Sequence, residues 1–296
     1  MLKVLIFGGS GLIGSRIKQL LEIKYKIIAP SHKQVDVVNE KQTEQIIKRS
    51  QPDYIIYAAG LTSVDEAEKY PELANLLNIR VPGFIARLAA SAGIPLLYFS
   101  TDAVFDGLKT DKPYTEDEKT NPLSVYGKSK LLGERQVLDA SNKNCIVRVI
   151  MVYSHIFIQR KRFIQIILET LKKGEKVYGV IDQVVNPIYV DDVVWAIDRL
   201  LESKSYGIYH LGATDYVTNY EFVIKLAKVF HINENLVQKI DFEKFFEGRA
   251  LRSKFCWLDT SKFRKKFGDN TLHFVDESIR LFKKNLDLLE IPQKYQ

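Results

Sequence analysis

The sequence predicts an α/β fold built on a doubly wound parallel sheet, because three features of its first half agree. Short apolar runs alternate with segments whose apolar residues recur at helical spacing. These runs are almost uninterrupted by polar residues, as expected of strands that are buried on both faces of a parallel sheet. The first run ends in a glycine-rich turn that opens a helix, which is typical of a nucleotide-binding sheet.

The elements of the first half follow one another in a regular order. Residues 2–7 predict the first strand and residues 12–22 predict the first helix. The next elements are predicted as strands at 26–29, 53–57, 95–100 and 145–149, with helices at 40–50, 72–92 and 124–140. Gly93 is expected to end the long helix as a C-cap. This alternation predicts a Rossmann-type sheet with helices on both faces.

The regular alternation of strands and helices ends after about residue 153. Helices are predicted at 160–172, 191–201, 219–230 and 272–286, with a short strand at 207–211. We therefore expect a dinucleotide-binding Rossmann domain over residues 1–153 and a smaller, mainly substrate-binding domain over residues 154–296. Later segments near 182–210 and 272–286 are expected to pack back on the first domain.

Composition restricts the class of protein. Hydrophobic residues make up 46% of the 296 residues and charged residues 27%, the usual balance of a soluble globular protein. The formal charge of +7 is spread over both halves, which argues against a nucleic-acid partner. No apolar run reaches 18 residues and no signal peptide precedes the first strand, so we expect no membrane partner. Cys145 and Cys256 fit no disulfide framework or zinc spacing, so a cytoplasmic location is expected.

Three glycines lie on the turn between the first strand and the first helix. Gly8 lets the chain reverse, Gly11 lets the backbone approach a ligand, and Gly14 lets helix and strand pack closely. Amide groups at the helix N-terminus then face a pyrophosphate, with help from the helix dipole. The turn therefore predicts a dinucleotide site.

The choice of dinucleotide depends on the end of the second strand. An NAD-selective site usually carries an acidic residue there, to bind the ribose hydroxyls. This strand end instead carries Ser31, His32 and Lys33, which can accept a 2′-phosphate. Asp36 lies further on and can reach the adenine region. NADP(H) is therefore the favoured cofactor, with NAD(H) as the alternative.

Tyr126 and Lys130 lie four residues apart on the predicted helix at 124–140, so they share one helix face. An ammonium beside a tyrosine favours the phenolate and lowers the tyrosine pKa. Such a pair can exchange a proton with a carbonyl as a hydride moves. Thr101 ends the preceding strand, where ligands bind in these sheets, and can donate to the same oxygen.

These motifs together resemble the extended short-chain dehydrogenase/reductases. Finer stretches are similar to the dTDP-4-dehydrorhamnose reductase group within that family. They are residues 58–68 (AAGLTSVDEAE), 99–107 (FSTDAVFDG), 121–122 (NP), 125–130 (VYGKSK), 133–134 (GE), 182–183 (DQ) and 258–262 (LDTSK). The resemblance runs from residue 1 to about residue 285, and it implies an NAD(P)H-dependent reductase of a nucleotide-linked 4-keto-6-deoxysugar.

The resemblance also implies roles for single residues. Thr101, Tyr126 and Lys130 would be catalytic, with Tyr126 as the acid. The expected cofactor contacts are Gly8, Ser10, Gly11, Leu12, Ile13, Gly14, Ser31, His32, Lys33, Asp36, Val37, Ala58, Ala59, Gly60, Leu61, Phe99, Tyr126 and Lys130. The expected substrate contacts are Thr62, Val64, Asp102, Ala103, Met151 and Arg252. Arg252 would meet the phosphates of the sugar nucleotide, although it can instead pair with a surface carboxylate.

Four positions depart from the pattern of the group. Ala103 and Met151 replace large aromatic residues, Val185 replaces a glycine, and residues 252–256 read RSKFC. All four departures fall where the sugar or base is expected to bind, so two alternatives stay open. One is a nucleotide-sugar epimerase or dehydratase, although such dehydratases carry an acid where Ala103 stands. The other is a cofactor-binding regulatory subunit, as in the β subunit of methionine adenosyltransferase.

Oligomeric state and metal content are the last expectations. The helices predicted at 72–92 and 124–140 can form a dimer bundle or pack on the sheet, so a homodimer is one option. Some relatives bind a metal at a dimer contact through glutamates. Arg16 stands at the matching position here, so we predict no metal.

Overall fold

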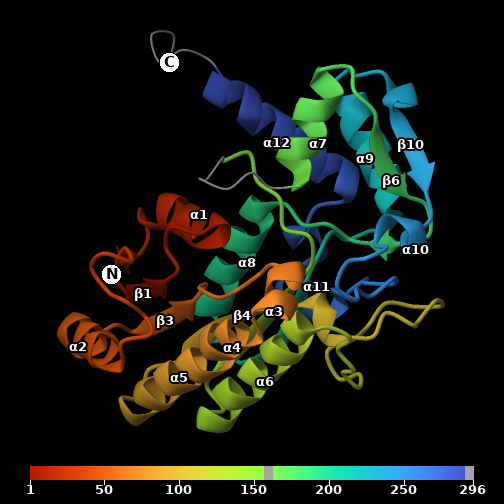
Figure 1. Cartoon of the computed structure of the whole chain (residues 1–296). Helices are drawn as coiled ribbons and strands as arrows, with labels where there is room; N and C mark the ends of the chain where they lie inside the picture. Colours follow the sequence, from red (N-terminus) through yellow and green to blue (C-terminus); the bar gives the residue numbers. More distant parts are fainter. Residues whose placement is uncertain (157–162, 291–296) are drawn as a thin grey trace.

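A parallel sheet of six strands forms the centre of the fold (Figure 1). The computed structural model describes residues 1–156 and 163–290. The strands are β1 (Lys3–Phe7), β2 (Lys26–Ile28), β3 (Tyr54–Tyr57), β4 (Leu96–Thr101), β5 (Cys145–Val149) and β8 (Gly207–Leu211). Their spatial order is β2-β1-β3-β4-β5-β8, and every pairing is parallel. The order reverses beside β1, so the carboxyl ends of β1 and β3 mark the place where such sheets bind ligands.

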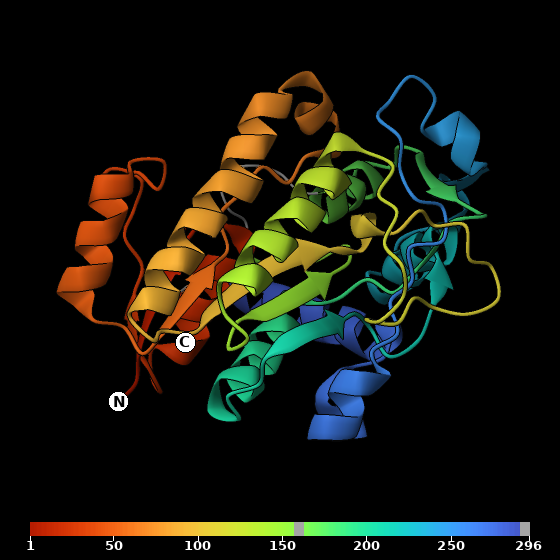
Figure 2. The same cartoon turned by 90° about the horizontal axis from the view of Figure 1, so that it is seen from below.

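Helices cover both faces of this sheet, which confirms the predicted fold class (Figure 2). Alternate side chains of β1 point to opposite faces: Val4 and Ile6 to one, Leu5 and Phe7 to the other. The first face packs on α1 (Leu12–Leu21), α8 (Val190–Glu202) and α11 (Ser261–Phe267). The second packs on α2 (Glu40–Ser50), α5 (Val81–Ser91) and α6 (Val125–Ala140).

The helix predicted at 72–92 is interrupted. It consists of α4 (Pro71–Asn75), a π-helical turn over Leu76–Arg80, and α5, and it ends before Gly93, whose φ is +71°. The hydroxyls of Tyr57 and Tyr98 donate to the carbonyls of Leu77 and Asn78 in this turn. Two strand tyrosines therefore hold the wide turn against the sheet.

The second half builds a smaller layer beyond the carboxyl end of the sheet (Figure 1). Its elements are α7 (Phe163–Lys172), β6 (Val177–Val180), β7 (Val184–Val185), β9 (Val217–Thr218), α9 (Asn219–Val229), β10 (Val237–Ile240), α10 (Phe242–Phe245) and α12 (Val275–Glu290). Residues 160–162 of the helix predicted at 160–172 lie outside the described residues. β8 joins the edge of the main sheet, whereas the boundary placed at residue 153 stays a prediction.

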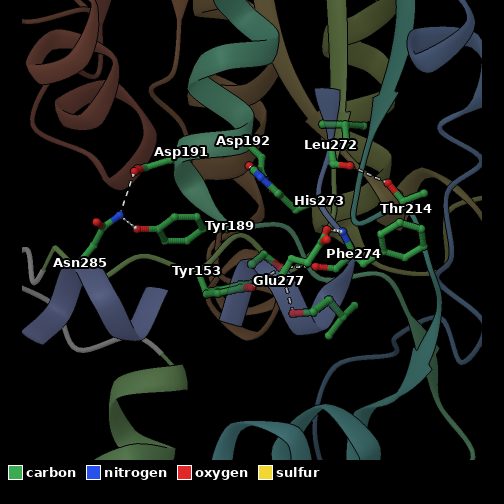
Figure 3. A network of polar contacts seen from close by, with 12 residues as sticks. Tyr153, Tyr189, Asp191, Asp192, Thr214, Leu272, His273, Phe274, Glu277 and Asn285 are labelled. Atoms are coloured by element: carbon green, nitrogen blue, oxygen red, sulfur yellow. Dashed lines mark hydrogen bonds and ion pairs between the residues drawn. The ribbon is translucent and has the colours of Figure 1, made fainter. Parts of the chain in front are cut away.

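Polar contacts connect α12 to the start of α8 (Figure 3), and α8 is bonded in turn to α1. Asn285 of α12 donates to the Tyr189 hydroxyl at 2.8 Å and to Asp191 at 3.4 Å. Arg16 of α1 donates two hydrogen bonds to the same Asp191, at 2.6 and 2.7 Å. Within the described residues, no group of three acidic, histidine or cysteine side chains could hold a metal ion, and no helix is long and apolar enough to cross a bilayer.

Glu134 and Arg148 form an ion pair between α6 and β5, with both side chains almost completely buried. Two guanidinium nitrogens donate to the carboxylate at 2.9 and 2.7 Å, and the Ser100 hydroxyl donates to it at 2.5 Å. Breaking a buried pair leaves one uncompensated charge in the core.

We therefore predict that Glu134→Gln lowers the free energy of unfolding by about 3–5 kcal/mol. The exposed pair between Glu44 and Lys48 provides the control, because Glu44→Gln should cost less than about 1 kcal/mol. Urea unfolding at pH 7 measures both. Equal costs for the two variants would contradict the assigned role of the buried pair.

Candidate active site

The turn after β1 forms an open backbone cradle. Gly8 has a φ of +91°, and its carbonyl accepts the Gly11 amide at 2.9 Å. A Cβ on Gly14 would lie 2.3 Å from the Gly8 carbonyl oxygen, and one on Gly8 would lie 2.5 Å from the Ala58 backbone. Gly11 is the N-cap of α1 and adds no side-chain cap. The first amides of α1 are thus left for a ligand, as the glycine pattern predicted.

A cavity of about 930 Å³ extends from this cradle along the ends of β1 and β3. Many of the predicted cofactor residues line it: Gly8, Ser10, Gly11, Leu12, Ile13, His32, Asp36, Val37, Ala58, Ala59, Gly60 and Tyr126. Gly14, Ser31, Lys33, Leu61, Phe99 and Lys130 do not line it. Ser31 is bonded to Gln34 through its amide and its hydroxyl. Phe99 packs in the core on the face of α1 and α8, because strand alternation directs it there.

Asn78, in the π turn, binds the loop after β3 through its side chain. Its side chain accepts the Leu61 amide and donates to the Leu61 carbonyl, each at 3.0 Å, and also donates to the Ser129 hydroxyl. Gly60, with a φ of +144°, lies so close that a Cβ would be 2.6 Å from the Asn78 amide oxygen. The π turn over Leu76–Arg80 therefore also holds in place the loop after β3, which lines the cavity.

The three residues predicted to be catalytic come from two elements. Thr101 ends β4, and Tyr126 and Lys130 lie in the first turns of α6, which Ser124 caps by accepting the Gly127 amide. Glu68 also accepts the Val125 amide at 2.8 Å, so the short helix α3 (Val64–Lys69) tethers the start of α6. The Thr101 hydroxyl donates to Asp102 Oδ1 at 2.9 Å, and Thr101 and Tyr126 both line the cavity described above.

The pKa of Tyr126 differs from what the sequence predicted. Burial raises the pKa of Tyr126 to about 12, and the Asp102 charge adds to the rise, whereas Lys130 was expected to lower it. The Lys130 ammonium lies 3.9 Å from the centre of the Tyr98 ring and lines neither cavity. Burial lowers the pKa of Lys130 to about 7, against the opposing effect of Glu134. The ammonium is therefore only weakly favoured here, because burial penalises its charge.

A second cavity, of about 750 Å³, opens on the other side of Tyr126. Both cavities share the residues Val64, Thr101, Asp102, Tyr126, Met151, Phe163 and Arg252. Of the predicted substrate residues, Ala103 lines only the second cavity and Thr62 only the first. Met151 adopts a φ of +40°, an uncommon conformation for a residue with a side chain.

Most of the wall of the second cavity was not predicted. Its apolar part comes from α7 (Phe163, Ile166, Ile167), from β6 (Val177, Tyr178) and from α10 with the residue after it (Phe245, Phe246). Such residues read as ordinary core in the sequence. Gln183 belongs to a motif quoted for the resemblance and lines this cavity, whereas Val185 is buried in the core.

Arg252 lies where the two cavities meet. It donates to the Asp65 carboxylate at 2.6 Å and stacks on the Phe246 ring at 4.9 Å. The Arg252 guanidinium holds the pKa of Asp65 below its usual value. The alternative of a carboxylate partner is thus realised in this structure, while the side chain also faces both cavities.

The arrangement places a tyrosine hydroxyl, as a proton donor, between a backbone cradle for anionic groups and a large second cavity. A carbonyl compound bound in the second cavity would lie beside Tyr126 and within reach of a dinucleotide in the first. This geometry suits proton transfer coupled to hydride transfer.

Comparisons with known proteins agree with this geometry. A family model described as RmlD substrate binding domain matches residues 2–286. The dTDP-4-dehydrorhamnose reductase of Aggregatibacter actinomycetemcomitans is 33% identical over 282 residues, covering 90% of this chain and 94% of that protein. The methionine adenosyltransferase 2 subunit beta of Xenopus laevis is 30% identical, with 89% and 82% covered. The structure of dTDP-4-dehydrorhamnose reductase from Bacillus anthracis in complex with NADP has a TM-score of 0.89 at 29% identity, with 96% and 99% covered.

The lowered pKa of Lys130 predicts a dependence of stability on pH. Its folded pKa of about 7 lies below the ordinary value of 10.5, so between these values the unfolded chain binds more protons. The stability penalty is therefore full below about pH 7 and is relieved as the pH rises toward 10.5.

We expect the free energy of unfolding of the wild type, relative to Lys130→Met, to rise by up to about 1.4 kcal/mol per pH unit in this window. Denaturant unfolding at pH 7, 8 and 9 measures it. Lys128→Met, an exposed change on the same helix, is the control. Its free energy of unfolding should depend on pH in the same way as that of the wild type. A Lys130→Met curve parallel to the wild type would show that the ammonium is not buried at a cost.

Proposed function

This chain belongs to the RmlD substrate binding domain family, and we propose that it is an NADP(H)-dependent reductase of a nucleotide-linked 4-keto-6-deoxysugar. The observation that carries this proposal is the place of Tyr126 between the two cavities, beside Thr101 on their shared wall. One cavity has the size and cradle for a dinucleotide. The other has the size and the cationic residues for a sugar nucleotide.

The residues around the cradle fit a dinucleotide, because Gly11 caps α1 without a side chain and the start of the helix faces the cavity. Gly8, Ser10 and Gly11 would hold the diphosphate, and His32 and Asp36 would lie near the adenosine. Tyr126 and Lys130 would contact the nicotinamide ribose. When bound, the dinucleotide supplies the hydride. The relative solved in complex with NADP supports NADP(H), with NAD(H) as the alternative, and His32 is the one predicted strand-end residue that lines the cavity.

In the proposed reaction, Tyr126 protonates the sugar oxygen as the carbonyl carbon is reduced. Thr101, which lines the same wall of the two cavities, would help to orient the sugar oxygen beside Tyr126. Arg252 and the nearby Arg249 supply positive charge for the diphosphate, and the Phe245 and Phe246 rings offer an apolar wall for the base. Ala103 and Met151 line the same cavity, so they would adapt it to a sugar that differs from the usual substrate of the group.

Two alternatives are separated by one assay. The relation to methionine adenosyltransferase 2 subunit beta favours a non-catalytic, cofactor-binding regulatory subunit as the second candidate. An epimerase or dehydratase on the same scaffold would act without net consumption of cofactor. Purified protein incubated with NADPH or NADH and a panel of nucleotide-linked ketosugars gives turnover, isomerisation, or binding without chemistry. Turnover supports the proposal, and either other outcome overturns it. We also propose a cytoplasmic location, with a homodimer as one option for the assembly.

The first functional prediction concerns Tyr126. Tyr126→Phe removes the acid but keeps the ring, so kcat should fall by on the order of 10²–10⁴-fold. Cofactor affinity, measured by NADPH fluorescence, should be nearly unchanged. A Tyr126→Phe variant with a kcat close to that of the wild type would refute the assignment.

The second functional prediction concerns Arg252. A charge-assisted hydrogen bond is worth about 1.5–3 kcal/mol, so Arg252→Ala should raise KM for an accepted sugar nucleotide roughly 10- to 150-fold. Steady-state kinetics measure this, with Arg135→Ala, an exposed change on α6, as the control. An unchanged KM in a folded Arg252→Ala protein would show that Arg252 does not contact the diphosphate.

A further inference from the structure

We propose that Asp65 is a positioning residue for the sugar nucleotide: it holds the Arg252 guanidinium where the two cavities meet, so that the remaining N–H groups of this fork face the diphosphate. The inference rests on the proposed function, and it adds a residue that acts through Arg252. Asp65 lies in the first turn of α3 and lines neither cavity, so it has no direct contact with a ligand in either of them.

The Asp65 carboxylate binds the segment after α10 at two points. Its Oδ1 accepts the Ala250 amide at 3.0 Å, and its Oδ2 accepts an N–H of Arg252 Nη2 at 2.6 Å. Arg252 Nη1 donates in turn to the Ala250 carbonyl at 2.7 Å. These three hydrogen bonds tie the segment that carries Arg252 to α3.

The Arg252 guanidinium is held on a third side by an aromatic ring. Its centre lies 4.9 Å from the centre of the Phe246 ring, and only 19% of the Arg252 side chain is exposed. The hydrogen bonds to Asp65 and Ala250 use two of the five N–H groups of the guanidinium, which leaves three for a ligand. A side chain that is already ordered loses less conformational freedom when a ligand binds.

The short helix α3 also sets the place of this fork relative to Tyr126. Asp65 and Glu68 lie three residues apart, so they share one helix face. Glu68 accepts the amide of Val125, the residue before Tyr126, at 2.8 Å. One helix therefore binds both the segment that carries Arg252 and the start of α6. Because the diphosphate of a sugar nucleotide is bonded to the sugar ring, the spacing of Arg252 and Tyr126 helps to set which carbonyl reaches the acid.

The negative charge of Asp65 has an opposing effect, because it cancels part of the attraction of Arg252 for a phosphate. The Asp65 side chain is half exposed, so water and salt screen this charge. Arg249 and Lys176 line the second cavity and supply positive charge beyond that of the ion pair. We therefore expect the ordering of Arg252 to outweigh the loss of charge.

The test is the affinity for a nucleoside diphosphate, measured by isothermal titration calorimetry with whichever of dTDP, UDP, GDP and CDP the wild type binds best. Asp65→Asn keeps an acceptor for the Ala250 amide but removes the charged partner of Arg252, so Kd should rise roughly three- to tenfold. In an Arg252→Ala background the same change should alter Kd by less than about twofold, because Asp65 acts through Arg252. Glu72→Gln, an equal loss of charge at an exposed site on α4, is the control and should leave Kd unchanged.

NADPH affinity, measured by fluorescence, separates positioning from a general loosening of α3. It should be the same in Asp65→Asn as in the wild type, because the phosphates of the dinucleotide are assigned to the cradle at Gly8 and Gly11.

Three results would overturn the inference. They are a nucleoside diphosphate affinity that is unchanged or tighter in Asp65→Asn, an equal loss with and without Arg252, and a parallel loss of NADPH affinity. A wild type that binds none of the four nucleoside diphosphates overturns the proposed function instead. Binding without reduction of any ketosugar overturns only the reductase activity, since calorimetry does not depend on turnover.

Discussion

The buried ion pair between Glu134 and Arg148 is the interaction on which the geometry of the site depends. Glu134 lies one helical turn after Lys130 on α6, and it binds Arg148 on β5 and Ser100 on β4. One carboxylate therefore connects the helix that carries Tyr126 to the strand that ends in Thr101. This connection fixes the position of α6 relative to the end of β4, so that Tyr126 and Thr101 line the same two cavities.

Close backbone contacts also fix the elements around the cavity that begins at Gly8. A Cβ on Gly133 would lie 2.1 Å from the Asn78 carbonyl oxygen, so α6 packs directly on the π turn. Asn78 in turn holds the Leu61 backbone, and Gly14 brings α1 onto Gly8. Two strand ends, one irregular turn and two helices thus define the meeting point of the cavities.

The sequence predicted the central fold well, because buried parallel strands leave an apolar signal and the Gly8 turn has a specific spacing. It also placed Thr101 and Tyr126 at one site, and both line the two cavities, whereas the Lys130 ammonium lies against the Tyr98 ring. It could not predict the π turn at Leu76–Arg80, since that turn depends on tyrosines from two strands. It missed the apolar cavity wall at Phe245 and Phe246, because such residues have no motif. The pKa of Tyr126 was predicted in the wrong direction, because spacing indicates a neighbouring charge but not the depth of burial.

The central claim is that a hydride enters a sugar carbonyl beside Tyr126, and isotope transfer tests it most directly. The protein would be incubated with NADPH that carries deuterium at C4 of the nicotinamide and with an accepted nucleotide-linked ketosugar. The account predicts one deuterium on the former carbonyl carbon of the product, seen by mass spectrometry and proton NMR. A product without deuterium, or an isomerised sugar with the cofactor unchanged, would contradict it.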